Sequence, residues 1–169
     1  LLFDQSEEGA GCGLGVAACG YVSGDMIYGT GYVQVKAALE SNAPLPMGFG
    51  LLKLAATALS TISGIPGGIF SPSLAVGAGV GATVAHLFPL SPDGAIILLG
   101  MVAYFSGVVQ APITAFVIVT EMTDNHAMVV PLMAASLIGY ATSRLVSRHG
   151  VYHALSAGFL TTAKASGAR

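Results

Sequence analysis

The sequence predicts an all-α integral membrane protein built from short, broken and tilted helices, some of them re-entrant. Of its 169 residues, 54% are hydrophobic and 8% are charged, whereas a soluble domain carries about 25% charged residues. The 6 basic and 8 acidic side chains cannot coat a soluble all-α core of this length. The 23 glycines and 8 prolines interrupt the apolar segments. Broken helices at membrane depth are typical of channels and transporters, where protein or a water-filled cavity covers the backbone.

The amino-terminal part carries the weakest apolar signal. Residues 1–12 are polar and acidic and are predicted to be a loop or a truncated edge. The chain is expected to begin inside a longer protein, because it lacks an initial Met and acidic residues stand where a signal peptide is basic. Residues 13–22 are weakly apolar. Residues 23–39 predict a glycine-rich turn and a short amphipathic helix, and 42–46 a linker with two prolines.

Five apolar segments follow, and most are too short to cross a bilayer upright, which takes about 20 helical residues. They comprise residues 48–63, 72–88, 95–109, 113–123 and 128–146. Lys53 lies within the first and is predicted to snorkel or to form a pair. Gly77, Gly79 and Gly81 lie within the second, where small residues allow close contact between helices.

The stretch SGIPGGIFSP, residues 63–72, joins the first two apolar segments. Pro72 fits the first turn of the following helix, where a missing N–H costs little. The amide groups of residues 68–71 then lie at the positive end of that helix and could bind an anion without a basic side chain. A tight loop between two packed helices explains the same residues equally well. A phosphate-binding loop does not fit, because no Lys follows the glycines.

Other polar residues give weaker signals. Glu121 lies in an apolar run, which suggests a proton carrier, but its place at the end of a short helix favours a structural role. His149 and His153 share one helix face, yet without a third ligand no metal site is predicted. Cys12 and Cys19 have neither metal spacing nor a disulfide framework and are predicted to be small buried residues.

Four stretches together resemble the CLC family of chloride channels and chloride/proton exchangers. They are GGIFSP with SLAVGAGVG, GTGY at 29–32, QAPITAFVIVTEMTDN at 110–125, and HGVYHAL at 149–155. The resemblance covers residues 13–157 and matches only the second of the two inverted halves of the family's membrane domain. It implies a half-domain over 13–157 and a cytoplasmic tail over 158–169.

The resemblance also implies a site. The main-chain amides of Ile69 and Phe70 match the positions that coordinate the family's central anion, and Gly68 adjoins them. Gly67 and Pro72 match the residues that shape this approach. Tyr152 matches a tyrosine whose hydroxyl donates to the same ion, although composition alone favours an interfacial tyrosine.

The implied function is transmembrane chloride transport, by a voltage-gated-type channel or a chloride/proton antiporter. The implied partners are chloride, the lipid bilayer, the transporter's amino-terminal half and a second copy, which would meet it through residues 113–123 and 128–146. Chloride is the transported ligand, and no cofactor is predicted. A net charge of −2 does not indicate nucleic acid.

Two alternatives come from other classes of protein. An intramembrane enzyme is not predicted, because Ser, His and Asp do not converge by any recognisable spacing. A structural subunit of a multi-pass complex stays open, although it does not require an amide-lined helix start. Basic residues at the end of the last apolar segment and beyond it predict a cytoplasmic carboxyl terminus in a bacterial-type inner or plasma membrane. These are Arg144, Arg148, Lys164 and Arg169.

Overall fold

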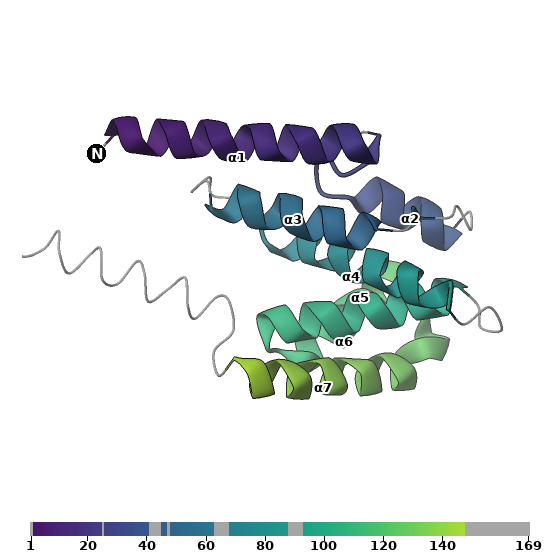
Figure 1. Ribbon diagram of the computed structural model, residues 1–169. Helices are drawn as coiled ribbons and strands as arrows, with labels where there is room; N and C mark the ends of the chain where they lie inside the picture. The colour runs from purple at the N-terminus through teal and green to yellow at the C-terminus, as the bar shows by residue number, and fades with distance from the viewer. Residues whose placement is uncertain are drawn as a thin grey trace, which may run out of the picture. The chain divides into compact units, whose positions relative to one another are not determined.

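The computed structural model describes residues 2–24, 26–40, 45–46, 48–62, 68–87 and 93–147. Within these ranges every regular element is a helix, which agrees with the predicted all-α fold (Figure 1). The chain divides into two compact units, residues 1–101 and 102–169, and the boundary falls inside helix α5. Each unit has its own helix contacts.

The first unit is organised around α3 and α4. Its helices are α1 (Leu2–Ser23), α2 (Tyr32–Glu40), α3 (Phe49–Ile62), α4 (Phe70–Ala85) and the first part of α5 (Asp93–Val109). Helix α3 packs against both α1 and α4, and α2 contacts α4. Residues 73–79 of α4 are all buried, so this helix forms the core of the unit. The predicted glycine-rich turn and short helix over 23–39 correspond to the segment before α2 and to α2 itself.

The amino terminus differs from the prediction. A loop or edge was expected over residues 1–12, whereas α1 begins at Leu2. The prediction took polarity as the sign of a loop, but Gln5, Glu7 and Glu8 are residue types with good helix propensity. Polar composition therefore gave no information about the backbone in this part of the chain.

Glycines allow the helices of the first unit to touch through their backbones. A Cβ on Gly79 would lie 2.5 Å from the Gly50 nitrogen, so α3 and α4 meet where neither has a side chain. On the other side of α4, a Cβ on Gly81 would lie 2.8 Å from the Ile96 carbonyl oxygen of α5. A Cβ on Gly100 would lie 2.6 Å from the Gly81 Cα. The prediction that small residues of this helix allow close contact between helices is confirmed at Gly79 and Gly81, which contact different neighbouring helices.

The second unit contains the end of α5, α6 (Pro112–Thr123), the short 3₁₀ helix η1 (His126–Met128) and α7 (Val129–Val146). Helices α6 and α7 pack side by side (Figure 1). Helices α5 and α7 also meet closely, because a Cβ on Gly139 would collide with the Ala103 carbonyl. The fully buried Ser106 hydroxyl donates to the Ser136 carbonyl oxygen at 2.7 Å. Small residues and serine hydroxyls thus join two largely apolar helices, as is common in membranes.

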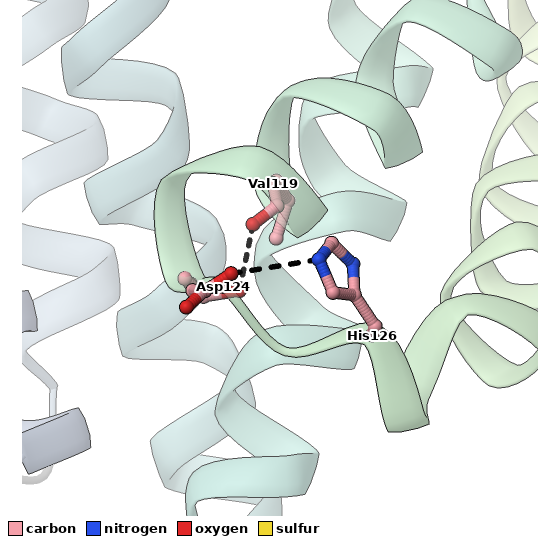
Figure 2. Close-up of polar contacts among 4 residues, drawn as sticks. Val119, Asp124 and His126 are labelled. Carbon is pink, nitrogen blue, oxygen red and sulfur yellow. Dashed lines mark hydrogen bonds and ion pairs between the residues drawn. The ribbon is translucent and has the colours of Figure 1, made fainter.

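Local residue chemistry sets both ends of α6. Pro112 occupies its first turn, where a proline costs no helical hydrogen bond. Asp124 ends the helix in the left-handed conformation, with φ of 50°, and aspartate tolerates this conformation better than most residues. Its carboxylate lies 3.5 Å from the His126 imidazole (Figure 2). The side chains of Asp124 and His126 are 96% and 68% exposed, so this contact adds little to stability.

Helix length agrees with the prediction of short segments. Among the described residues, one helical stretch, His126–Val146, is long and apolar enough to cross a membrane. The other apolar helices run to between 10 and 17 residues. The short helices follow the glycine and proline positions that predicted them.

Candidate functional site

The candidate site lies at the amino end of α4. The helix begins at Phe70, with Ile69 before it at φ −77° and ψ −19°, and no side chain caps this end. Pro72 lies in the first turn, as predicted. The backbone amide and hydroxyl of Ser73 both donate to the Ile69 carbonyl oxygen, at 3.1 and 2.7 Å. These hydrogen bonds complete the first turn of the helix. Its amide groups lie at the positive end of a 16-residue helix.

Gly68 leads into this helix and is exposed. A Cβ placed on it would meet no described atom within 4 Å, and its φ is not in the left-handed range. Neither packing in the described chain nor backbone strain therefore requires glycine here. The absence of a side chain does leave the main chain at residues 68–70 accessible to a small ligand, since Ile69 and Phe70 are only half-buried.

The electrostatics of this helix end come from the backbone. The first turn of α4 contains no acidic residue, and no basic side chain occurs between Gly68 and Ala85. An anion bound here would be held by partial charges on amide groups. Such binding can replace water around an ion and still release it, which a permeant ion needs.

The environment of Lys53 in α3 differs from the prediction. Lys53 does not snorkel to the surface, since the residue is 3% exposed, and its partners are carbonyl oxygens rather than a described carboxylate. Its ammonium donates to the carbonyl oxygens of Ile27 and Gly29, both at 2.6 Å. The correction has a physical reason, because a loop folds over α3 and supplies the oxygen atoms that water would otherwise provide.

The predicted site residues are only partly described. Gly68, Ile69, Phe70 and Pro72 are brought together at the start of α4. Gly67 and Tyr152 lie outside the described residues, so the predicted meeting of the tyrosine hydroxyl with this helix start stays a prediction. His149 and His153 also lie outside them.

The weaker candidates do not form a second centre in the described part of the chain. Glu121 is exposed near the end of α6. Among the described residues, no three His, Cys, Asp or Glu side chains are grouped so that they could hold a metal ion. Cys12 and Cys19 are free and half-buried, whereas they were predicted to be small buried residues.

Sequence reasoning missed the carbonyl partners of Lys53 and the polar contacts between α5 and α7. A lysine inside an apolar run was a usable signal, but its partners lie 24 and 26 residues away. The second group includes the Gln110 side-chain amide, which donates to the Ser147 carbonyl oxygen at 2.9 Å. It also includes the Ser143 hydroxyl, which donates to the Gly107 carbonyl oxygen at 2.6 Å.

Residues 7–144 match the protein family described as "Voltage gated chloride channel". The chain belongs to this CLC family. The "H(+)/Cl(-) exchange transporter ClcA" of Yersinia pestis bv. Antiqua (strain Angola) is 32% identical over 139 residues, which cover 76% of this chain and 29% of that protein. The protein of the same name from Yersinia pseudotuberculosis serotype O:3 (strain YPIII) gives the same values.

A third relative with that name, from Vibrio vulnificus (strain YJ016), is 38% identical over 99 residues, or 55% of this chain and 21% of the relative. The aligned part of this CLC chain thus spans less than a third of the length of these relatives. The family match includes GGIFSP and the start of α4, and it ends before Tyr152.

Proposed function

We propose that this CLC chain forms part of a transporter that moves chloride across a membrane. The observation that carries the proposal is the start of α4, where exposed Gly68 and half-buried Ile69 and Phe70 lead into an apolar helix without a side-chain cap. Family membership supports chloride as the ion. The names of the relatives favour chloride/proton exchange over a channel.

In the proposed site, chloride lies against the main-chain amides of Gly68, Ile69 and Phe70. The dipole of α4 adds a partial positive charge of about half an elementary charge at this end. Gly67 and Pro72 shape the approach, and the Tyr152 hydroxyl donates one further hydrogen bond. Because these donors are uncharged, the ion is held without a full positive charge that would trap it.

The proposed transporter lies in a lipid bilayer. It contains an amino-terminal half in addition to this chain, and it pairs with a second copy of the protein. Several apolar side chains of α6 and α7 are exposed, among them Ile113, Val130 and Ile138 at 71%, 69% and 66%. We assign these exposed side chains to a homodimer contact. Light scattering of the protein in detergent should give a dimer, and Ile138→Trp should give a monomer. A monomer before substitution contradicts the assignment.

The carboxyl terminus is proposed to lie in the cytoplasm, on the side that the basic residues after α7 favour. A green fluorescent protein fused after Arg169 should fluoresce, and alkaline phosphatase fused there should be inactive. The reverse pattern would place this end outside.

Transport is tested with the full-length protein that contains this chain, reconstituted in liposomes under a chloride gradient. Chloride efflux and external pH are recorded together. Chloride movement with stoichiometric proton movement supports an exchanger, and chloride movement alone supports a channel. No chloride movement contradicts the proposal and favours the structural-subunit alternative.

The site is tested by chloride binding to the same protein, measured by calorimetry. Tyr152→Phe removes one hydrogen bond to a charged partner, worth about 1.5–3 kcal/mol, so chloride affinity should fall about 10- to 150-fold. Gly68→Ala should also weaken binding, although its Cβ meets no described atom. Ile69→Val is the matched control, since the proposed contact there is an amide and not a side chain. Unchanged affinity in Tyr152→Phe and Gly68→Ala would contradict the assigned site.

A further inference from the structure

The Lys53 side chain is buried in the core of the first unit, where a charge is stable only with close polar partners. Its two acceptors, the carbonyl oxygens of Ile27 and Gly29, belong to the segment between α1 and α2. Both distances are 2.6 Å, as expected for hydrogen bonds from a charged donor. Within the described residues no carboxylate forms an ion pair with this ammonium. The backbone of one short segment therefore holds the charge.

That segment has the conformation needed to present two carbonyl groups to one ammonium. Gly24, Gly29 and Gly31 all adopt left-handed backbone angles, with φ of 62°, 68° and 76°. Side chains other than glycine rarely adopt these angles. The turns bring Ile27 and Gly29 to the same nitrogen atom. We call residues 26–31 the Lys53 loop.

The Lys53 loop also touches α4. A Cβ on Gly31 would lie 2.7 Å from the Ala75 Cβ and 3.3 Å from the Lys53 Cε, so this glycine fills the space between α3 and α4. Ala75 follows Phe70 by five residues and lies on the second turn of α4. The loop, Lys53 and the amino-terminal half of α4 thus meet at one point.

We infer that Lys53 is a positioning residue, whose ammonium fastens the Lys53 loop to α3 and so sets the position of the amino end of α4. Its effect on chloride rests on the proposed function, whereas its effect on the loop does not. Without the ammonium, the two carbonyl groups lose their hydrogen-bond donor, and a cavity is left where the charged group was buried. The loop then loosens, and the support of Gly31 against Ala75 is lost.

The experiment compares variants of the full-length protein by hydrogen–deuterium exchange and by chloride binding. Lys53→Met removes the charge and the donors and keeps a long side chain. Deuterium uptake of the peptide covering residues 26–31 should become at least tenfold faster, because the two hydrogen bonds to Lys53 hold this loop against α3. Chloride affinity should fall by about tenfold, or about 1.4 kcal/mol, because the amide groups at the start of α4 move from the positions that bind the ion.

Two further variants separate positioning from a general loss of folding. Lys53→Arg keeps the charge and can donate to both carbonyl groups, so it should restore slow uptake and most of the affinity. Lys36→Met makes the same substitution at an exposed lysine of α2 and should change neither measurement. If Lys53→Met does not fold, Gly31→Ala tests the same junction from the loop side, where the added Cβ meets Ala75.

The outcomes are distinct. Wild-type uptake in both Lys53→Met and Gly31→Ala overturns the inference. Faster uptake with unchanged chloride affinity overturns the link from the loop to α4. Faster uptake with weaker binding, reversed in Lys53→Arg, supports both steps. If the unsubstituted protein binds no chloride, the proposed function fails, and the uptake data still decide whether Lys53 holds the loop.

Discussion

The contact between α3 and α4 at Gly50 and Gly79 leads to a quantitative prediction for Gly79→Ala. The added Cβ would lie 2.5 Å from the Gly50 nitrogen and 2.6 Å from its Cα, whereas ordinary contacts begin near 3.4 Å. The atoms it meets are backbone, so no rotamer change can relieve the overlap. The helices must separate by about 0.9 Å, and such overpacking costs about 1–3 kcal/mol.

The control is Gly13→Ala in α1, where a Cβ would meet nothing within 4 Å. Both substitutions replace a helical glycine by alanine, so both gain about 1 kcal/mol of helix propensity. The difference between the two variants therefore isolates the overpacking. At about 2–4 °C per kcal/mol for a chain of this size, Gly79→Ala should melt about 2–12 °C below Gly13→Ala.

Thermal unfolding in detergent, followed by circular dichroism at 222 nm, measures this difference directly because the described fold is helical. Equal melting temperatures for the two variants would refute the backbone contact between α3 and α4. No substitution at Gly50 can restore the stability lost in Gly79→Ala, since Gly50 already lacks a side chain that could be made smaller. The contact therefore depends on glycine at both positions.

Three further predictions concern the second unit. Ser106→Ala removes the buried hydrogen bond to Ser136 and should lower the free energy of unfolding by about 1 kcal/mol, measured by the same melting experiment. Gln110→Ala removes the donor to the Ser147 carbonyl and should speed deuterium uptake at the end of α7. Unchanged uptake would show that this hydrogen bond does not stabilise the end of the helix. Asp124→Asn keeps a residue that tolerates left-handed angles, so its melting temperature should match that of the unsubstituted protein within error.

Much of the helical layout was predictable because glycine and proline mark its boundaries. The predicted segment 113–123 corresponds to α6, Pro112–Thr123, and 95–109 corresponds to α5, Asp93–Val109. The start of α4 was also close, since Pro72 is compatible only with the first turn of a helix. Such boundaries depend on local backbone chemistry, which the sequence displays directly.

The contacts between distant segments were not predictable in the same way. Lys53 of α3 finds its acceptors in the loop that precedes α2, and only the folded backbone turns those carbonyl groups toward it. Ser106 and Ser136 are 30 residues apart, and neither is unusual in composition. The predicted role of Tyr152 likewise depends on a long-range approach, and it stays a prediction.

Comparison of α4 with α6 shows which residue the fold leaves unexplained. Both helices start without a hydrogen bond from a capping side chain, so an uncapped start does not by itself indicate a ligand. Helix α6 has Pro112 at its beginning, which removes a donor that needs a partner. Helix α4 is preceded by Gly68, which has no left-handed φ and no close described neighbour. Among the described residues nothing obstructs a Cβ at this position, whereas in the proposed site the added methyl group would obstruct a small anion approaching the amide groups. Under the proposed function, Gly68→Ala should therefore weaken chloride binding without lowering the melting temperature.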